Sequence, residues 1–147
     1  MSLRDWLNNG WLIEHKTSRQ EITDLLAVAD RDLADCQAEG LSPDWRLGIA
    51  YNAALQAATA ALAIAGYRAT RAEHHYRTIQ SLAYTIGADA DIVTRFDAFR
   101  KKRNIGGYER AGLISTREAD EMVDLARRLR CEVEESIRMQ RPDVLDE

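Results

Sequence analysis

Apolar residues recur at intervals of three and four positions in five segments of the chain, with short polar breaks between them. This spacing puts the apolar side chains on one helix face, so each segment predicts an amphipathic helix. A shorter apolar segment with Trp6 and Trp11 predicts one further helix near the N-terminus. No stretch alternates apolar and polar residues for long enough to indicate a sheet. We therefore predict an all-α fold, an antiparallel bundle of about five helices with a short extra N-terminal helix.

The ends of the five segments carry typical helix start and stop residues. Ser18 and Ser115 each precede a glutamate by three positions, which predicts a capping box at two helix starts. Ser42 is followed by Pro43, a residue that fits the first helical position. The third and fourth helices are expected to begin near residues 71 and 89. The expected helix ends lie at Gly40, Gly66, Gly87 and Pro142.

The second segment is rich in alanine nearly all round from Ile49 onward. Small side chains let other helices approach closely, so we expect this helix at the centre of the bundle. Its uncharged run to Tyr67 contains Asn, Gln and Thr and is expected to be too weakly hydrophobic for a membrane span. Core positions expected on the last three helices are His75, Ile79, Leu82, Ala83 and Ile86; Ile92, Val93, Phe96 and Phe99; and Ala119, Met122, Ala126, Leu129, Val133 and Ile137.

Length and composition indicate one soluble domain. The chain has 147 residues, 46% hydrophobic and 30% charged. We expect an N-terminal arm at 1–16, the bundle at 17–140 and a tail at 141–147. The N-terminal segment contains Asp5 and Glu14 and has no cleavage pattern, so we do not expect a secretion signal. We therefore expect a cytoplasmic location.

Neither cysteine nor histidine spacing predicts a metal site. Cys36 and Cys131 stand far apart, and we expect both to act as small apolar residues on helix faces. His74 and His75 are adjacent, whereas helical zinc ligands need a three- or four-residue step. We expect one of these two rings to turn inward and be hydrogen-bonded and the other to be exposed. No metal and no cofactor are expected.

Positive charge is concentrated in one part of the chain. The net charge is −4, but residues 66–110 carry nine Lys and Arg against five acids, a local excess of +4. Its densest part is Arg100-Lys101-Lys102-Arg103, at the end of the fourth helical segment. Arginine matches phosphate oxygens in pairs and lysine adds point charges, so this run predicts a site for a phosphate-bearing ligand. Cations also complement the dipole at a helix C-terminus, which leaves a purely structural role open.

Several features resemble the HEPN (higher eukaryotes and prokaryotes nucleotide-binding) superfamily of small α-helical bundles. The resemblance covers about residues 17–140 and includes the order of the helical segments. It implies a bundle that binds nucleotides or RNA, often as a metal-independent ribonuclease whose Arg and His motifs meet at a homodimer interface. It also implies a minimal nucleotidyltransferase as a partner protein. The residues that carry it are Tyr51-x-x-Ala54, His74-His75, and Arg103-Asn104 followed by Gly107-Tyr108.

The resemblance places Arg103 at the motif arginine, which would hold the scissile phosphate, and Asn104 at the polar residue after it. The motif histidine, which helps to move the proton of the 2′-hydroxyl, is expected at 108, 109 or 110. Those positions hold Tyr108, Glu109 and Arg110, so the motif is incomplete. A phenol with an ordinary pKa of about 10 is a poor base at neutral pH. Binding is therefore expected in preference to cleavage.

Three hypotheses remain. The first is a HEPN-like homodimer without catalysis that binds a nucleotide, RNA or a partner protein through Arg100, Lys101, Lys102, Arg103, Asn104 and Tyr108. The second is a toxin-like ribonuclease, as in toxin–antitoxin systems, that uses Arg103 with Tyr108, His74 or His75. The third is a structural interaction module whose basic end serves only fold and solubility. Trp45, Tyr51 and Tyr84 could stack on bases, but helical aromatics are expected as core or groove fillers. No membrane partner is expected.

Overall fold

The computed structural model describes residues 1–105 and 114–145, with side chains described throughout these ranges except at 104 and 105. It confirms the all-α bundle with a short N-terminal helix and adds a two-stranded sheet. The elements in chain order are α1 (Leu3–Asn8), β1 (Leu12–Glu14), α2 (Arg19–Asp35), α3 (Pro43–Ile64), β2 (Tyr67–Ala69), α4 (His74–Thr85), α5 (Ala90–Ile105), α6 (Thr116–Gln140) and α7 (Pro142–Leu145).

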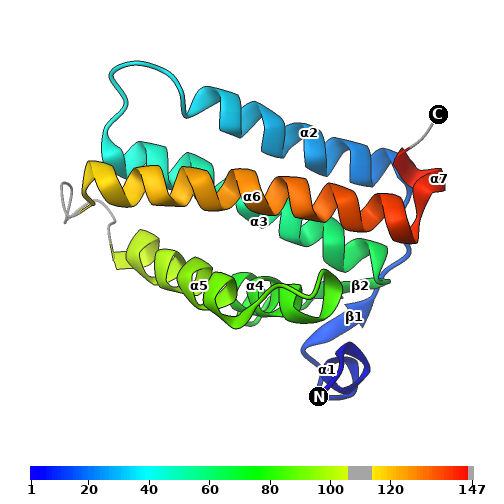
Figure 1. The fold of residues 1–147 in the computed structure, drawn as a ribbon. Helices are drawn as coiled ribbons and strands as arrows, with labels where there is room; N and C mark the ends of the chain where they lie inside the picture. Colours follow the sequence, from blue (N-terminus) through cyan, green and yellow to red (C-terminus); the bar gives the residue numbers. More distant parts are fainter. Residues whose placement is uncertain (106–113, 146–147) are drawn as a thin grey trace.

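Helix α3 lies at the centre, as expected, and contacts α2, α4, α5 and α6. Figure 1 shows α2 running antiparallel to α3, whereas α3 and α6 run in the same direction. An ion pair near the starts of both helices reflects this parallel arrangement, with Arg46 Nη1 2.6 Å from Asp120 Oδ1. The alanines of α3 permit the close approach, since Ala50, Ala54 and Ala57 are fully buried.

The apolar faces expected on α5 and α6 are confirmed, because all ten positions named for these helices are buried. The prediction of the buried face of α4 is partly wrong, because Ala83 is exposed, while Thr78 and Ser81 are buried. Their burial is compatible with their polarity because each hydroxyl donates to a carbonyl of its own helix. Thr78 Oγ1 bonds the oxygen of His74 at 2.8 Å, and Ser81 Oγ bonds that of Thr78 at 2.6 Å.

The N-terminal arm packs on the same chain through a small sheet that the sequence did not predict. Strands β1 and β2 are antiparallel and pair Leu12 with Ala69. Trp6, Leu12, Leu62 and Ala69 form a second, smaller core beneath α1. Strands of three residues are too short for an alternating pattern to be recognised, which explains the omission.

Helix ends agree with the sequence at some positions and differ at others. The capping box at Ser115 is complete, but at Ser18 only the serine half forms. The carboxylate of Glu21 instead bonds Thr17 Oγ1 at 2.6 Å and His15 Nε2 at 2.7 Å. Helix α2 ends at Asp35, before the expected stop at Gly40. Helix α4 begins at His74, later than expected, because the preceding Glu73 adopts the left-handed conformation with φ 54°.

Helix α3 requires a correction concerning membranes. Within the described ranges, it is the one helix long and apolar enough to cross a membrane by length and composition. The expectation that it is too weakly hydrophobic is therefore wrong by this criterion. In the bundle, 67% of its most apolar window is buried, as in the core helix of a soluble protein, so it is weak evidence for a span.

The two cysteines differ in environment. Cys36 is buried at the end of α2, as expected, and its thiol donates to the carbonyl of Leu33 at 3.1 Å. Burial raises the pKa of this thiol. Cys131 is exposed on α6, so the expectation that it packs on an apolar face is wrong.

Candidate functional site

The basic cluster, Arg100–Arg103, occupies the C-terminal part of α5. Phe96 and Phe99 anchor this helix because both rings are buried in the main core. Its start is capped by Asp89, whose Oδ1 accepts from the backbone nitrogen of Ile92 at 3.1 Å. These contacts fix the helix, and the four cations therefore project from a firmly packed element.

Three of the four cations expected to hold a phosphate-bearing ligand have carboxylate partners in the same chain. The buried Asp97 accepts from Arg100 Nε at 2.6 Å, and its second oxygen lies 3.6 Å from Lys101 Nζ. Lys102 forms an ion pair with Glu118 at the start of α6. These pairs leave less positive charge for a ligand than the sequence suggests.

Arg103 differs from its three neighbours. Among the described residues it makes no ion pair, and it is exposed. Its guanidinium carbon lies 5.0 Å from the centroid of the Tyr51 ring, within the range of a cation–π contact. Stacking on an aromatic ring orients the guanidinium plane while leaving its N–H donors open to a ligand.

Tyr51 connects Arg103 to a histidine. The tyrosine is buried in α3, and its hydroxyl oxygen lies 3.2 Å from Nδ1 of His75 in the first turn of α4. The two rings are tilted by 44° with centroids 5.9 Å apart. The structure thus brings an arginine, a tyrosine and a histidine from three helices into one group, which we call the Tyr51 cluster (Tyr51, His75 and Arg103).

Protonation in the Tyr51 cluster is set by burial and by the nearby arginines. Burial raises the pKa of Tyr51 to about 12, against the opposing effect of Arg103 and Arg100. Burial also lowers the pKa of His75, and the positive charge of Arg103 lowers it further. At neutral pH the phenol is therefore protonated and the imidazole uncharged, and the hydroxyl can donate to Nδ1.

His74 points to a different part of the surface. Its ring is half-buried and lines a pocket with Arg68, so the expectation of an exposed second histidine is wrong. Burial and then the charge of Arg68 lower the pKa of His74. The two imidazole rings meet edge to face with centroids 6.0 Å apart.

The structure describes only some of the other residues expected at the site. Asn104 belongs to α5, but its side chain lies outside the described part of the structure. Tyr108, Glu109 and Arg110 lie wholly outside it. Among the aromatic candidates, Tyr51 is buried, whereas Trp45 is 68% exposed and so is not a core filler. Tyr84 is partly exposed and packs edge-on against Trp6 at 5.4 Å between centroids.

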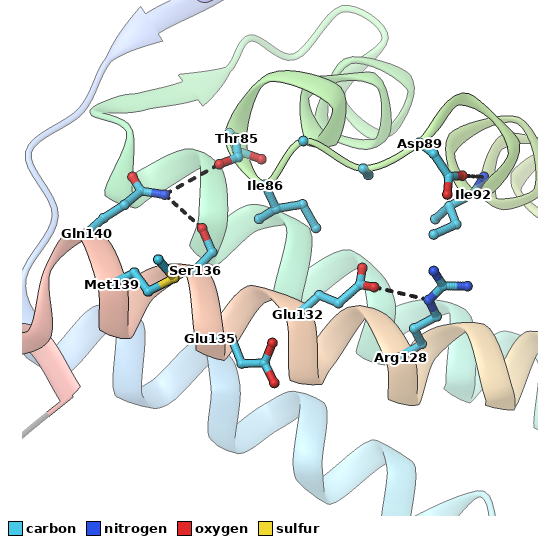
Figure 2. A pocket seen from close by; sticks show the side chains of 12 residues that line it. Thr85, Ile86, Asp89, Ile92, Arg128, Glu132, Glu135, Ser136, Met139 and Gln140 are labelled. Atoms are coloured by element: carbon cyan, nitrogen blue, oxygen red, sulfur yellow. Dashed lines mark hydrogen bonds and ion pairs between the residues drawn. The ribbon is translucent and has the colours of Figure 1, made fainter.

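A separate pocket of about 500 Å³ lies between the α4–α5 connection and the C-terminal half of α6. Figure 2 shows Asp89, Glu132 and Glu135 among its lining side chains, with Glu132 bonded to Arg128. None of the basic cluster lines this pocket. Its carboxylates make it a poor site for phosphate.

No group of three histidine, cysteine, aspartate or glutamate side chains in the described ranges is arranged to hold a metal ion. Comparison with known proteins adds no family: no protein-family model matches the chain, and no curated protein matches it significantly.

Proposed function

We propose that the protein is a HEPN-like binding module that holds a phosphate of RNA or of a nucleotide at Arg103, beside Tyr51 and His75. The observation that carries the proposal is the pairing pattern of the basic cluster. Among the described residues, Arg100, Lys101 and Lys102 each have a carboxylate partner, whereas Arg103 has an aromatic one. A cation that an aromatic ring orients keeps its N–H donors for an external anion.

Two features of the site support phosphate as the ligand. Arg103 can offer paired N–H donors to two phosphate oxygens. Arg100, although paired with Asp97, lies close enough for its charge to lower the pKa of His75. A phosphate bound here would in turn favour the protonated, doubly donating form of His75.

The position of His75 also favours a second candidate, metal-independent cleavage of RNA. The motif lacks a histidine at 108–110, but α4 supplies an imidazole to the group that contains Arg103. In the tautomer whose Nδ1–H donates to the hydroxyl oxygen of Tyr51, Nε2 of the uncharged imidazole is free to take the proton of a 2′-hydroxyl. An adjacent arginine can stabilise the charge that develops on the phosphate. The bond to Tyr51 would orient this ring.

RNA retention tests the binding proposal with a matched pair of variants. Arg103→Ala and Lys101→Ala each remove one cation from the same helix, but Lys101 is already paired with Asp97. We expect Arg103→Ala to weaken binding of a labelled RNA by about tenfold or more and Lys101→Ala to weaken it by about threefold or less. Equal losses would contradict a specific role for Arg103.

The same preparations test cleavage. RNA incubated with the wild-type protein in EDTA should stay intact if the protein only binds. Cleavage that disappears in Arg103→Ala and His75→Gln, while both variants remain helical, would establish the second candidate. Cleavage that persists in His75→Gln but is lost in Tyr108→Phe would assign the proton transfer to Tyr108. If the wild-type protein retains no RNA and no variant differs from it, the structural module is the remaining hypothesis.

A further inference from the structure

A basic pocket lies beside the start of α4 and is lined in part by His74. It has a volume of about 390 Å³. None of the described residues that line it carries a carboxylate; they are Ile13, Arg68, Ala69, Thr70, Arg71 and His74. Arg68 comes from β2 and Arg71 from the connection to α4, so the small sheet positions both arginines against the helix start.

The two arginines of this pocket are available to a ligand. Neither makes an ion pair with any residue of the described ranges, and both are exposed. Glu21 is near enough to Arg68 for that charge to lower its pKa, after the larger effect of its bond from Thr17. Its Oε1 is already bonded to Thr17 and His15, so it does not neutralise the arginine by direct contact.

The start of α4 adds partial positive charge at the same place. Glu73, in its left-handed conformation, provides no side-chain cap to the first turn. The backbone N–H groups of that turn carry the positive end of the helix dipole. This partial charge adds to the full positive charges of the two arginines, on which the phosphate site mainly depends.

The two adjacent histidines connect this basic pocket to the Tyr51 cluster. The ring of His74 lines the pocket, and the ring of His75 bonds Tyr51, beneath Arg103. Their centroids are 6.0 Å apart. A chain of ring contacts therefore links this pocket, through His74, His75 and Tyr51, to Arg103.

We propose that this pocket is a second phosphate subsite, so that the ligand is single-stranded RNA lying across the start of α4 and not a mononucleotide. This inference rests on the proposed function, because it takes Arg103 as the first phosphate contact. Single-stranded nucleic acids are held by cationic grooves that follow successive phosphates, and aromatic rings beside them can stack on bases. Two basic positions separated by a pair of half-buried histidines have this form.

The test compares a single-stranded RNA hexamer with a 5′-mononucleotide by fluorescence or calorimetric titration. For the wild type we expect the hexamer to bind about tenfold or more tightly than the mononucleotide. Arg68→Ala with Arg71→Ala should remove most of that gain and leave mononucleotide binding nearly unchanged. The dependence of log affinity on log salt for the hexamer should become shallower by about 1.4.

Arg128→Ala with Arg138→Ala is the matched control, since it removes two positive charges from α6. It should leave the preference for the hexamer intact. If the Arg68/Arg71 variant binds the hexamer as the wild type does, while Arg103→Ala abolishes binding of both ligands, the second subsite is wrong and the proposed function stands. If Arg103→Ala changes neither ligand, the proposed function fails as well.

Discussion

The hydroxyl of Tyr51 and Nδ1 of His75 lie 3.2 Å apart and connect the most buried helix of the bundle to the first turn of α4. Because Tyr51 also packs edge-on against Phe96 of α5, with centroids 5.6 Å apart, it contacts the two helices that contribute His75 and Arg103. A core residue thereby fixes how far His75 and Arg103 lie from each other in the candidate site. Changes at Tyr51 should therefore affect stability and ligand binding together, in proportions that depend on which part of the side chain is removed.

Tyr51→Phe keeps the ring that Arg103 stacks on and removes only the hydroxyl. We expect a loss of about 1 kcal/mol in the free energy of unfolding, because one hydrogen bond is lost and Nδ1 of His75 is left without this partner. RNA binding at Arg103 should remain. Tyr51→Ala should cost about 3–5 kcal/mol because it also leaves a cavity. Urea denaturation of both variants checks these values, and equal losses would show that the ring contributes little.

Stability should decrease as the pH falls from 7 to 5. Burial, reinforced by nearby cations, lowers the pKa of both His75 and His74 in the folded chain. The unfolded chain, with histidine pKa values near 6.5, therefore binds more protons than the folded chain in this range. The stabilisation is complete above about pH 6.5 and is lost as the pH falls towards the lowered values.

Urea denaturation at several pH values in this range measures that loss. The double variant His74→Gln with His75→Gln should show a flatter dependence on pH between 5 and 7. A variant that loses stability as steeply as the wild type would assign the effect to other groups. Glu21 does not contribute between pH 5 and 7, because its lowered pKa affects stability only below the ordinary value of 4.5.

Asp97→Asn should separate stability from ligand binding. The buried carboxylate of Asp97 pairs with Arg100 and Lys101, so its removal should cost about 2 kcal/mol in stability. It also frees two cations next to Arg103, and RNA affinity should therefore rise. Asp91→Asn is the matched control: it changes the charge of α5 equally, but at an exposed position whose partner Arg95 lies 4.0 Å away. The prediction fails if both variants raise RNA affinity to the same extent.

The alanine-rich surface of α3 should tolerate no larger side chain. Ala57 is fully buried in the main core, and Ala57→Leu should destabilise the fold by about 1–3 kcal/mol through overpacking. Ala27→Leu introduces the same side chain on the exposed face of α2 and should change stability by less than about 0.5 kcal/mol. Thermal and urea denaturation measure both effects. Equal stability of the two variants would contradict close packing around α3.

Local sequence patterns predicted the helices but not the way they meet. The spacing on α6 gave its buried face correctly because that face depends on one helix alone. The pair between Asp97 and Arg100 could have been found in the same way, because they lie three positions apart on one helix. The pair between Lys102 and Glu118 could not, since it depends on how the starts and ends of two helices are placed.

The Tyr51 cluster shows the same limit at the candidate site. Tyr51 and His75 are 24 residues apart, and no local rule predicts that α4 turns this ring towards α3. The sequence identified both residues separately, one as a core filler and the other as one of two adjacent histidines. The sequence therefore offered His74 or His75 as a replacement for the histidine missing at 108–110. It could not show which of these two rings lies in the same group as Arg103.

The pKa of His75, measured by NMR titration with and without saturating RNA, tests the central claim most directly. Arg103 now contributes to lowering this pKa, and a phosphate bound to Arg103 would offset that charge. We predict that RNA raises the pKa of His75 in the wild type and leaves it unchanged in Arg103→Ala. RNA that binds the wild-type protein without changing the pKa of His75 would contradict the account.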